Sequence, residues 1–331
     1  VMRAIICESW RDFAELEIKD MPRPALRPRS VRIKVAAAGV SFATQLVVAG
    51  KYQRKPPLPF TPGTEIVGTV LEAAPDADAP PPGSRVFAVV DWGGMAEEAI
   101  ADDIHTIAIP DGLPLEPAIG FPISYPTAGA ALLWRGRIKS GDWVLVHGAA
   151  GGVGLAAVEI AKACGAKVIA RAGAAKHGLL RACGADVVLD SAAPFRDAVR
   201  AATGRRGVDC MVDPIGGPAF DESLRCLADG GNLVVVGFAG GGIPTLQTNI
   251  LLLKNIGVIG VNWGTYVGWS PGDGRRDYAP AARALWEQLM VWWQQGALKP
   301  EIHAAYPLEQ FREAMAEVSA RRSAGRVILR P

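Results

Sequence analysis

The stretch Trp143-Val-Leu-Val-His-Gly-Ala-Ala-Gly-Gly-Val-Gly154 decides how this chain folds. It begins with a short apolar run, typical of a strand covered on both faces, and ends in closely spaced glycines. The next residues, 155–164, carry apolar side chains at helical spacing, and a further apolar strand is expected at 167–170. The sequence therefore predicts a unit in which a strand, a tight turn, a helix and a second strand follow one another.

The pattern Ala149-x-Gly151-x-x-Gly154 is a variant of the dinucleotide-binding fingerprint, with alanine in the first glycine position. Small residues are needed because the turn is tight, the backbone must approach a pyrophosphate and the helix must pack closely on the strand. Free N–H groups and the positive end of the helix dipole then bind the pyrophosphate. We expect Ala149, Gly151, Gly152 and Val153 to bind a dinucleotide; the alternative is an ordinary tight turn.

Composition predicts two domains with a large core. Of the 331 residues, 50% are hydrophobic and 21% are charged, and the formal net charge is +2. This charge gives no broad attraction for nucleic acid or an anionic membrane, and no apolar run reaches the length of a membrane span. Five widely spaced cysteines form neither a CxxC motif nor a disulfide framework. We therefore expect no nucleic-acid partner, no membrane partner and a cytoplasmic location.

The order of predicted elements indicates an α/β fold with two domains. Residues 1–122 contain many short strand patterns separated by turn signals, which is typical of a barrel-like β domain. From Trp143 onward, apolar strands alternate with helices, which predicts a parallel doubly wound sheet. The tail returns to strand patterns. We therefore assign residues 1–122 and 266–331 to one domain and residues 123–265 to a Rossmann dinucleotide-binding domain.

This order and several motifs resemble the zinc-independent quinone oxidoreductase (ζ-crystallin-like) family of the medium-chain dehydrogenase/reductase superfamily. The motifs are Pro57-Leu-Pro-Phe-Thr-Pro-Gly63 with Glu65, Gly83-Ser-Arg-Val86, Ala149 to Gly154, Gly184-Ala-Asp186, Gly207-Val-Asp209, Asp213-x-Ile-Gly-Gly217 and Gly325-Arg-Val-Ile-Leu. The resemblance covers essentially the whole chain. It implies a GroES-like β-barrel catalytic domain, hydride transfer from a nicotinamide to a quinone or other activated α,β-unsaturated carbonyl, and a homodimer formed through the last Rossmann strand, 258–261.

The sequence lacks the zinc ligands of related alcohol dehydrogenases. Those enzymes carry a Gly-His-Glu motif where this chain has Gly63-Thr64-Glu65, and a cysteine where it has Val40-Ser41. A zinc site needs three or four N, S or O ligands held together. The histidines are scattered, and each is expected to be a surface or a hydrogen-bonded residue: His105, His147, His177 and His303. We expect no metal.

The cofactor is expected to be NADPH. An NAD enzyme places Asp or Glu about 20 residues past the glycine loop, whereas this strand ends at Arg171, with Lys176 just beyond. Cations there suit bidentate binding of a 2′-phosphate; the alternative is a solvated helix start. Relatives often carry an Asn-Tyr pair where this chain has Asp190-Ser191. The resemblance also implies that Arg321 approaches the phosphate.

The nicotinamide is expected beyond the carboxyl ends of the strands. Candidate residues there are Thr127, which matches a family threonine, and Ile215, Gly216, Gly237, Phe238 and Asn262. Phe238 is alternatively a core residue. The expected catalytic donors are Tyr52 and Ser41, because a hydrogen bond suffices for an acceptor that spreads charge onto oxygen. Family members have Asn in place of Ser41 and Asp in place of Thr44, and Tyr52 is alternatively packed on its own domain.

Aromatic residues in glycine-rich segments offer a flat pocket for a planar acceptor, or alternatively core or subunit contacts: Trp92, Trp263, Tyr266 and Trp269. Trp263 is expected at a subunit interface. Two other functions remain open. A basic patch of Lys51, Arg54 and Lys55 would favour reduction of enoyl or acrylyl thioesters, because coenzyme A carries phosphates. The third possibility is an NADPH-binding structural or RNA-binding protein with little turnover.

Overall fold

The computed structural model describes all residues, Val1–Pro331, and the chain divides into two compact units. Unit 1 comprises Val1–Ile123, Gly264–Ala284 and Pro300–Pro331, and unit 2 comprises Ser124–Trp263 and Leu285–Lys299. The helix α9 (Arg275–Gln294) is therefore shared between the units. Residues 285–299 were expected in the first domain, but Leu285 packs against Gly129 and Trp286 against Trp263, so they belong to unit 2.

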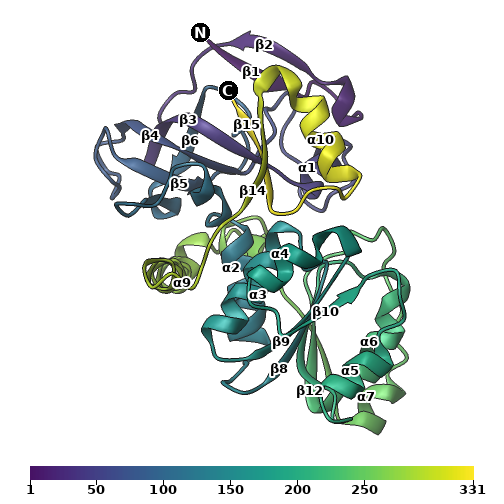
Figure 1. The fold of residues 1–331 in the computed structure, drawn as a ribbon. Helices are drawn as coiled ribbons and strands as arrows, with labels where there is room; N and C mark the ends of the chain where they lie inside the picture. The colour runs from purple at the N-terminus through teal and green to yellow at the C-terminus, as the bar shows by residue number, and fades with distance from the viewer. The chain divides into compact units, whose positions relative to one another are not determined.

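Unit 1 is built on a seven-stranded sheet in the order β14-β15-β3-β4-β5-β7, with β6 also paired to β3. Its strands are β3 (Ser30–Val40), β4 (Glu65–Ala73), β5 (Arg85–Val89), β6 (Glu98–Asp102), β7 (Thr106–Ala108), β14 (Ile302–Pro307) and β15 (Arg326–Arg330). The parallel pair β14 and β15 extends an otherwise antiparallel sheet. The return of the tail to the first domain, expected from the strand patterns, is thus a sheet addition (Figure 1).

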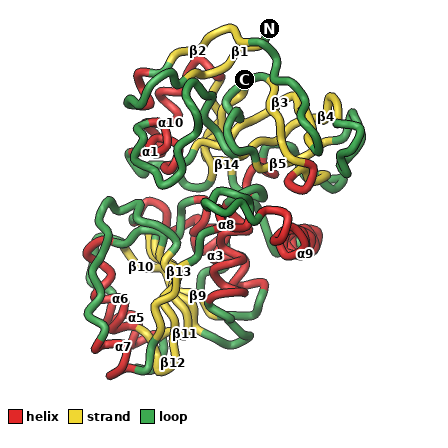
Figure 2. The backbone as a smooth tube through the Cα atoms, turned by 180° about the vertical axis from the view of Figure 1, so that it is seen from behind, coloured by secondary structure: helices red, strands yellow, loops and turns green.

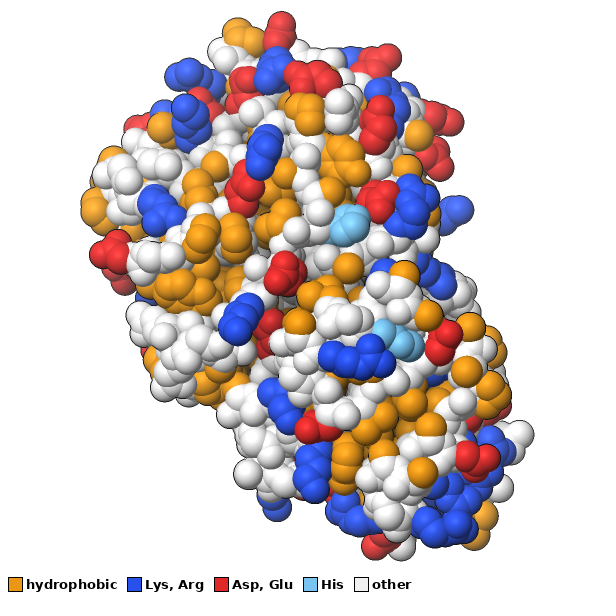
Figure 3. Space-filling view, viewed as in Figure 1, with side chains coloured by type: hydrophobic (Ala, Val, Ile, Leu, Met, Phe, Trp, Pro, Cys, Tyr) orange, Lys and Arg blue, Asp and Glu red, His pale blue; other side chains and the backbone are white.

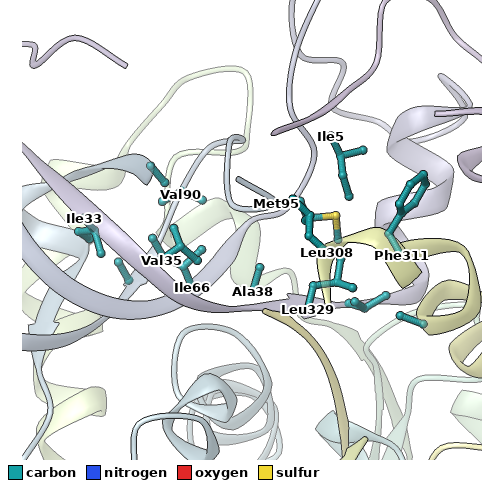
Figure 4. Packing of buried hydrophobic residues seen from close by; sticks show 14 of the residues in the cluster. Ile5, Ile33, Val35, Ala38, Ile66, Val90, Met95, Leu308, Phe311 and Leu329 are labelled. Atoms are coloured by element: carbon teal, nitrogen blue, oxygen red, sulfur yellow. The ribbon is translucent and has the colours of Figure 1, made fainter. Parts of the chain in front are cut away.

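Several elements, most of them in unit 1, were not predicted. They are the strand β2 (Glu17–Met21), which pairs with β1 (Met2–Ile6), and the helices α1 (Phe42–Val48), α8 (Trp263–Tyr266) and α10 (Phe311–Ser319). Helix α10 covers β15 with Phe311, Ala314 and Met315, which are buried. In the core of the unit, Met95, Leu308 and Phe311 lie close together beside Leu329 (Figure 4).

Unit 2 has a six-stranded parallel sheet in the order β10-β9-β8-β11-β12-β13. Its strands are β8 (Trp143–His147), β9 (Lys167–Ala172), β10 (Val187–Asp190), β11 (Val208–Asp213), β12 (Leu227–Val235) and β13 (Gly257–Gly260). The strand order reverses between β8 and β11, which is where doubly wound folds bind their ligands. The predicted Rossmann topology is therefore confirmed.

Helices cover both faces of this sheet. They are α2 (Ser124–Gly129), a π-helical stretch Ala130–Arg135, α3 (Gly152–Ala163), α4 (His177–Ala182), α5 (Arg196–Ala202), α6 (Phe220–Cys226) and α7 (Asn249–Lys254). Helix α3 lies on one face, and α5 and α6 lie on the other (Figures 1 and 2). Because both faces are covered, Val144, Leu145 and Val146 of β8 are fully buried.

On the face of the molecule shown in Figure 3, basic and acidic side chains are scattered among each other. This distribution agrees with the small net charge of +2. Among the helices, none combines the length and the apolar character that crossing a bilayer requires.

Candidate functional site: a dinucleotide loop and an aromatic pocket

The glycine loop between β8 and α3 has the shape that a pyrophosphate needs. Gly148 has a φ of +57°, and Gly151 is the N-cap of α3 with no side chain to occupy the first helical N–H groups. A Cβ added to Gly154 would lie 2.2 Å from the backbone oxygen of Gly148, whereas one on Gly151 would meet only that oxygen, at 3.5 Å. Gly154 is thus required for close packing, and Gly151 leaves open space in front of the helix.

This arrangement fits a dinucleotide. The N–H groups in the first turn of α3 have no intrahelical acceptor, and the helix dipole is positive at this end. Gly152 and Val153 are the first residues of that turn. Ala149, which replaces the first glycine of the fingerprint, is buried, and its N–H donates to the backbone oxygen of Arg171 at 3.1 Å.

The structure brings a second group of predicted residues to the same loop. A Cβ on Gly148 would lie 2.7 Å from Cδ1 of Ile215, and a Cβ on Gly216 would lie 2.9 Å from Cδ1 of Phe238. Buried Asp213 ends β11 and accepts from the N–H groups of Ile215 and Gly216, both at 2.9 Å. Burial raises the pKa of Asp213, and this effect outweighs the two hydrogen bonds, which lower it.

Asp213 thus orders the loop that carries Ile215 and Gly216. The N–H of Gly237 also donates to the backbone oxygen of Asp213, at 3.4 Å. Phe238 is 39% exposed, so the alternative that it is a core residue is wrong.

Arg171 is more enclosed than the sequence suggests. It is 9% exposed, its Nη2 donates to the backbone oxygens of Ser191 at 2.7 Å and Ala193 at 3.0 Å, and its Cζ lies 4.3 Å from the ring centroid of Phe195. Burial lowers its pKa. The alternative of a solvated helix start is therefore wrong for Arg171. Because Nη2 already donates two hydrogen bonds to backbone oxygens, Nη1 is the terminal nitrogen that could donate to a ligand.

The remaining predicted cofactor residues are dispersed. Thr127 is buried in α2, Lys176 follows β9 in a short 3-10 helix, and Asn262 is exposed just after β13. Arg321 belongs to unit 1, at a φ of +57°. Their contacts with a cofactor stay predictions.

His147, at the end of β8, is a hydrogen-bonded core residue. Its Nε2 lies 2.8 Å from Oγ of Ser223, which itself donates to the backbone oxygen of Ala219. The histidine is therefore the donor in this pair. Burial lowers its pKa to about 3, so the ring is neutral at physiological pH. The sequence could not pair His147 with Ser223, because they are distant in the chain and meet only through the sheet.

Unit 1 contains a pocket that brings both predicted catalytic residues together. Ser41 and Tyr52 line it with Thr44, Arg54, Trp92 and Trp269. Oγ of Ser41 and Oγ1 of Thr44 are 3.1 Å apart, so the two hydroxyl groups form a pair. Burial raises the pKa of Tyr52, although Gln53 and Arg54 act in the opposite direction. The phenol is therefore a neutral hydrogen-bond donor at physiological pH.

Arg54, which the sequence placed in a basic patch with Lys51 and Lys55, lines the wall of the pocket. Its Nη1 donates to the backbone oxygen of Asp91 at 2.8 Å, and its Nη2 lies 2.9 Å from Oδ1 of the same residue. Its Cζ lies 5.4 Å from the ring centroid of Trp92 and 5.3 Å from that of Trp269. Only Lys51 and Lys55 of the expected basic patch remain exposed.

Trp263 does not belong to this pocket, and its expected place at a subunit interface is wrong. The side chain is 3% exposed and packs within unit 2, 6.2 Å from Trp134 and 5.7 Å from Trp286 between ring centroids. Trp286 comes from α9, whose second half the sequence had placed in the other domain. Tyr266 packs edge-on against Tyr278, with 5.0 Å between centroids.

A buried ion pair lies next in sequence to Thr64, the residue that replaces the histidine ligand of zinc relatives. Glu65 is 2% exposed and pairs with Arg326 of β15. A Cβ on Gly39 would lie 2.5 Å from Nη2 of Arg326 and from Oε1 of Glu65, so the pair fills the space beside Gly39. Burial lowers the pKa of Arg326 to about 10. The structure contains no group of three or more His, Cys, Asp or Glu residues that could hold a metal ion.

Comparison with known proteins agrees with this architecture. Residues 27–111 match the alcohol dehydrogenase GroES-like domain, and residues 152–285 match the family described as zinc-binding dehydrogenase. Quinone oxidoreductase-like protein 2 of Rattus norvegicus is 40% identical, over 99% of this chain and 91% of the relative. Quinone oxidoreductase of Homo sapiens is 32% identical, over 95% of this chain and 93% of that protein.

A solved mycobacterial structure, complexed with NADPH, has a TM-score of 0.89 at 31% identity and covers 100% of both chains. Fold and loop together define an NAD(P)-dependent oxidoreductase of the medium-chain dehydrogenase/reductase superfamily. The chain belongs to the quinone oxidoreductase family of that superfamily, which confirms the resemblance noted in the sequence.

Proposed function

We propose that the protein is an NADPH-dependent, zinc-independent reductase of quinones or other activated α,β-unsaturated carbonyls. The observation that carries this proposal is the pocket of unit 1, in which a neutral phenol, a hydroxyl pair and two indoles line one cavity. Such a pocket suits a flat acceptor that needs a hydrogen bond to its oxygen. The names of the relatives support the quinone as acceptor.

In this proposal the bound nicotinamide supplies a hydride, and the chain supplies position and polarisation. The glycine loop holds the pyrophosphate with Ala149, Gly151, Gly152 and Val153. The residues that hold the nicotinamide end are Thr127, Ile215, Gly216, Gly237, Phe238 and Asn262. Tyr52 donates its phenolic proton in a hydrogen bond to the acceptor oxygen. The hydroxyl of Ser41, ordered by Thr44, acts as the second donor.

The thioester alternative is less well supported. A basic patch at the pocket mouth would favour it, but Arg54 is paired with Asp91 in the pocket wall. The first experiment is oxidation of NADPH and of NADH by the purified protein, tested in parallel with a benzoquinone, a naphthoquinone, a simple enone and crotonyl-CoA. Fast turnover of quinones with NADPH supports the proposal. Turnover of crotonyl-CoA alone would replace it by thioester reduction.

NADPH preference is assigned to Arg171, Lys176 and Arg321. We expect Arg171→Glu to weaken NADPH binding about 10-fold more than NADH binding, because one charge-assisted hydrogen bond to the 2′-phosphate is lost. The measurement is fluorescence titration with both cofactors. Arg181→Glu, an exposed change of the same charge on α4, is the control. Equal losses for both cofactors would show that Arg171 only orders the loop that contains Ser191.

Zinc independence gives a second prediction. Dialysis against a chelator should leave NADPH-dependent quinone reduction unchanged, because no cluster of metal-ligating side chains exists. The measurement is activity before and after treatment, with metal content determined by elemental analysis. Loss of activity that added zinc restores would overturn zinc independence.

We propose in addition that the two units are the catalytic domain and the dinucleotide-binding domain, and that the protein forms a homodimer through β13. Strand β13 is the edge of its sheet, paired only with β12. Nearby α7 carries Leu252 and Leu253, which are 79% and 76% exposed. An unpaired edge beside apolar side chains suits a subunit contact. Light scattering of the purified protein, with Leu252→Glu as a disrupting variant, tests this assembly.

A further inference from the structure

The wall of the acceptor pocket includes a tryptophan from a distant part of the chain. Trp269 lies in the irregular segment 267–274, just before α9, whereas the other lining residues named above come from residues 41–92. Its ring and that of Trp92 both lie near the guanidinium of Arg54. The position of this segment therefore determines whether the indole of Trp269 lines the pocket together with that of Trp92.

Arg275, at the start of α9, ties that segment to the sheet of unit 1. Its Nη2 lies 3.0 Å from Oδ1 of Asp91, and its Nη1 lies 2.5 Å from Oδ2 of Asp102, at the end of β6. Its Nε lies 2.6 Å from Oδ1 of Asp273 within the segment. The Arg275 side chain is 11% exposed, and those of Asp91 and Asp102 are 15% and 10% exposed, so these two contacts are largely shielded from water, whereas Asp273 is exposed.

Asp91 connects this anchor to the pocket. Its Oδ1 is shared between Arg275, at 3.0 Å, and Arg54, at 2.9 Å. Burial raises the pKa of Asp91, but the two arginines outweigh burial and the net shift is downward, so the carboxylate is charged at physiological pH. A displacement of Arg275 is therefore transmitted to the guanidinium that both indoles contact.

Gly268 gives an independent indication that the contact is built into the segment. Its φ is +85°, which disfavours any side chain. A Cβ there would lie 2.2 Å from Nε of Arg275 and 2.3 Å from Oδ1 of Asp273. The ion pair thus packs directly on the Cα of Gly268, one residue before Trp269.

We propose that Arg275 is a positioning residue that sets acceptor specificity by holding Trp269 and Arg54 in the pocket wall for flat, fused-ring acceptors. The proposal rests on the reductase function proposed above. A flat ring system uses the area of both indoles, whereas a small acyclic enone needs only the hydrogen-bond donors. Arg275 should therefore affect the two kinds of acceptor differently.

The test compares Arg275→Met with Arg276→Met. In the first variant Asp91 keeps Arg54 and Asp102 keeps Arg27, so no carboxylate of the sheet is left without a cation. Arg276 is the adjacent, half-exposed residue, whose contact to Asp103 is 3.5 Å, and it serves as the matched control. The variants Arg275→Lys and Gly268→Ala complete the set.

With an unsubstituted naphthoquinone as acceptor, we expect Arg275→Met to raise KM about 10-fold, because the displaced Trp269 no longer positions the ring system. With a small acyclic enone, KM should change less than about 2-fold, and so should the affinity for NADPH, which is the range of a surface change. Arg275→Lys should recover part of the loss, Gly268→Ala should reproduce it, and Arg276→Met should behave as wild type. Equal losses for both acceptors would overturn the proposal.

Two readouts separate this inference from the proposed function. Hydrogen exchange of the segment 264–274 and binding of naphthoquinone, followed by tryptophan fluorescence, need no turnover. If the wild type reduces no acceptor, the function fails; faster exchange and weaker naphthoquinone binding in Arg275→Met would still support the positioning role. Unchanged exchange and binding in that variant would overturn it.

Discussion

Replacing Tyr52 by phenylalanine should lower kcat for quinone reduction about 100- to 1000-fold, the loss seen when a donor to a developing oxyanion is removed. The phenol lies in the acceptor pocket, and burial keeps it protonated. Its hydrogen bond strengthens as charge moves onto the acceptor oxygen, so the loss should fall on kcat rather than on cofactor binding. Stopped-flow oxidation of NADPH measures the step directly.

Ser41→Ala is the matched control within the same pocket. Its hydroxyl is paired with Thr44 at 3.1 Å, so we expect the second donor to contribute less than the phenol, by about 10-fold in kcat. A Tyr52→Phe variant with unchanged kcat would show that Tyr52 only packs on its own domain. A larger loss of kcat in Ser41→Ala than in Tyr52→Phe would show that Ser41 is the main donor and Tyr52 the second one.

The pH dependence follows from the same environment. The donor is the protonated phenol, and its pKa lies above the ordinary value of 10 because burial disfavours the phenolate. Turnover should therefore stay level from neutral pH to about pH 9 and fall only as the phenol ionises, above its raised pKa. A decline centred near neutral pH would point to a different group as donor.

Gly151→Ala should weaken NADPH binding about 10- to 100-fold, the equivalent of one lost charged hydrogen bond, while leaving the fold intact. Gly151 has a φ of −77°, and the added methyl would meet only the backbone oxygen of Gly148, at 3.5 Å. The methyl group would instead occupy the space in front of α3 where the pyrophosphate is expected. Isothermal titration measures the affinity, and thermal unfolding measures the stability.

Gly154→Ala makes the complementary change. Its methyl would lie 2.2 Å from the oxygen of Gly148 and 2.7 Å from Cα of Ala149. Backbone atoms must then move, so we expect a loss of about 1–3 kcal/mol in the free energy of unfolding together with the loss of binding. Gly173→Ala is the control, because nothing lies within 4 Å of that Cβ. If Gly151→Ala bound NADPH with the affinity of the wild type, the proposal that the pyrophosphate binds at this loop would be wrong.

Local sequence patterns were sufficient for much of the fold. The continuous apolar run at Val144 to Val146, the glycine spacing and the helical spacing that follows specify a strand, turn and helix through contacts between near neighbours. The alternating pattern of β3 likewise specifies one buried face. The helices α1 and α10, of 7 and 9 residues, were missed because they lie among strand patterns that predicted a β domain, and because packing rather than a long periodic pattern stabilises them.

The division of α9 could not be read from the sequence. One continuous helix presents Leu285 and Trp286 to unit 2, and Arg275 to the sheet of unit 1. Helical periodicity states which residues share a face, but not which unit that face contacts. The same limit explains Trp263, whose partners Trp134 and Trp286 are remote in sequence.

The sequence by itself determined the Rossmann loop, which depends on spacing within a short segment. Its resemblance to a known family, carried by motifs along the whole chain, also gave the GroES-like domain and the family. Only the tertiary structure decided the partners of the charged residues. Arg171 binds the backbone oxygens of Ser191 and Ala193, and Arg275 pairs with Asp91, which lies 184 residues earlier in the chain. A buried guanidinium is stable only when acceptors surround its N–H groups. These acceptors come from strands and loops that are distant in sequence and meet only in the folded chain.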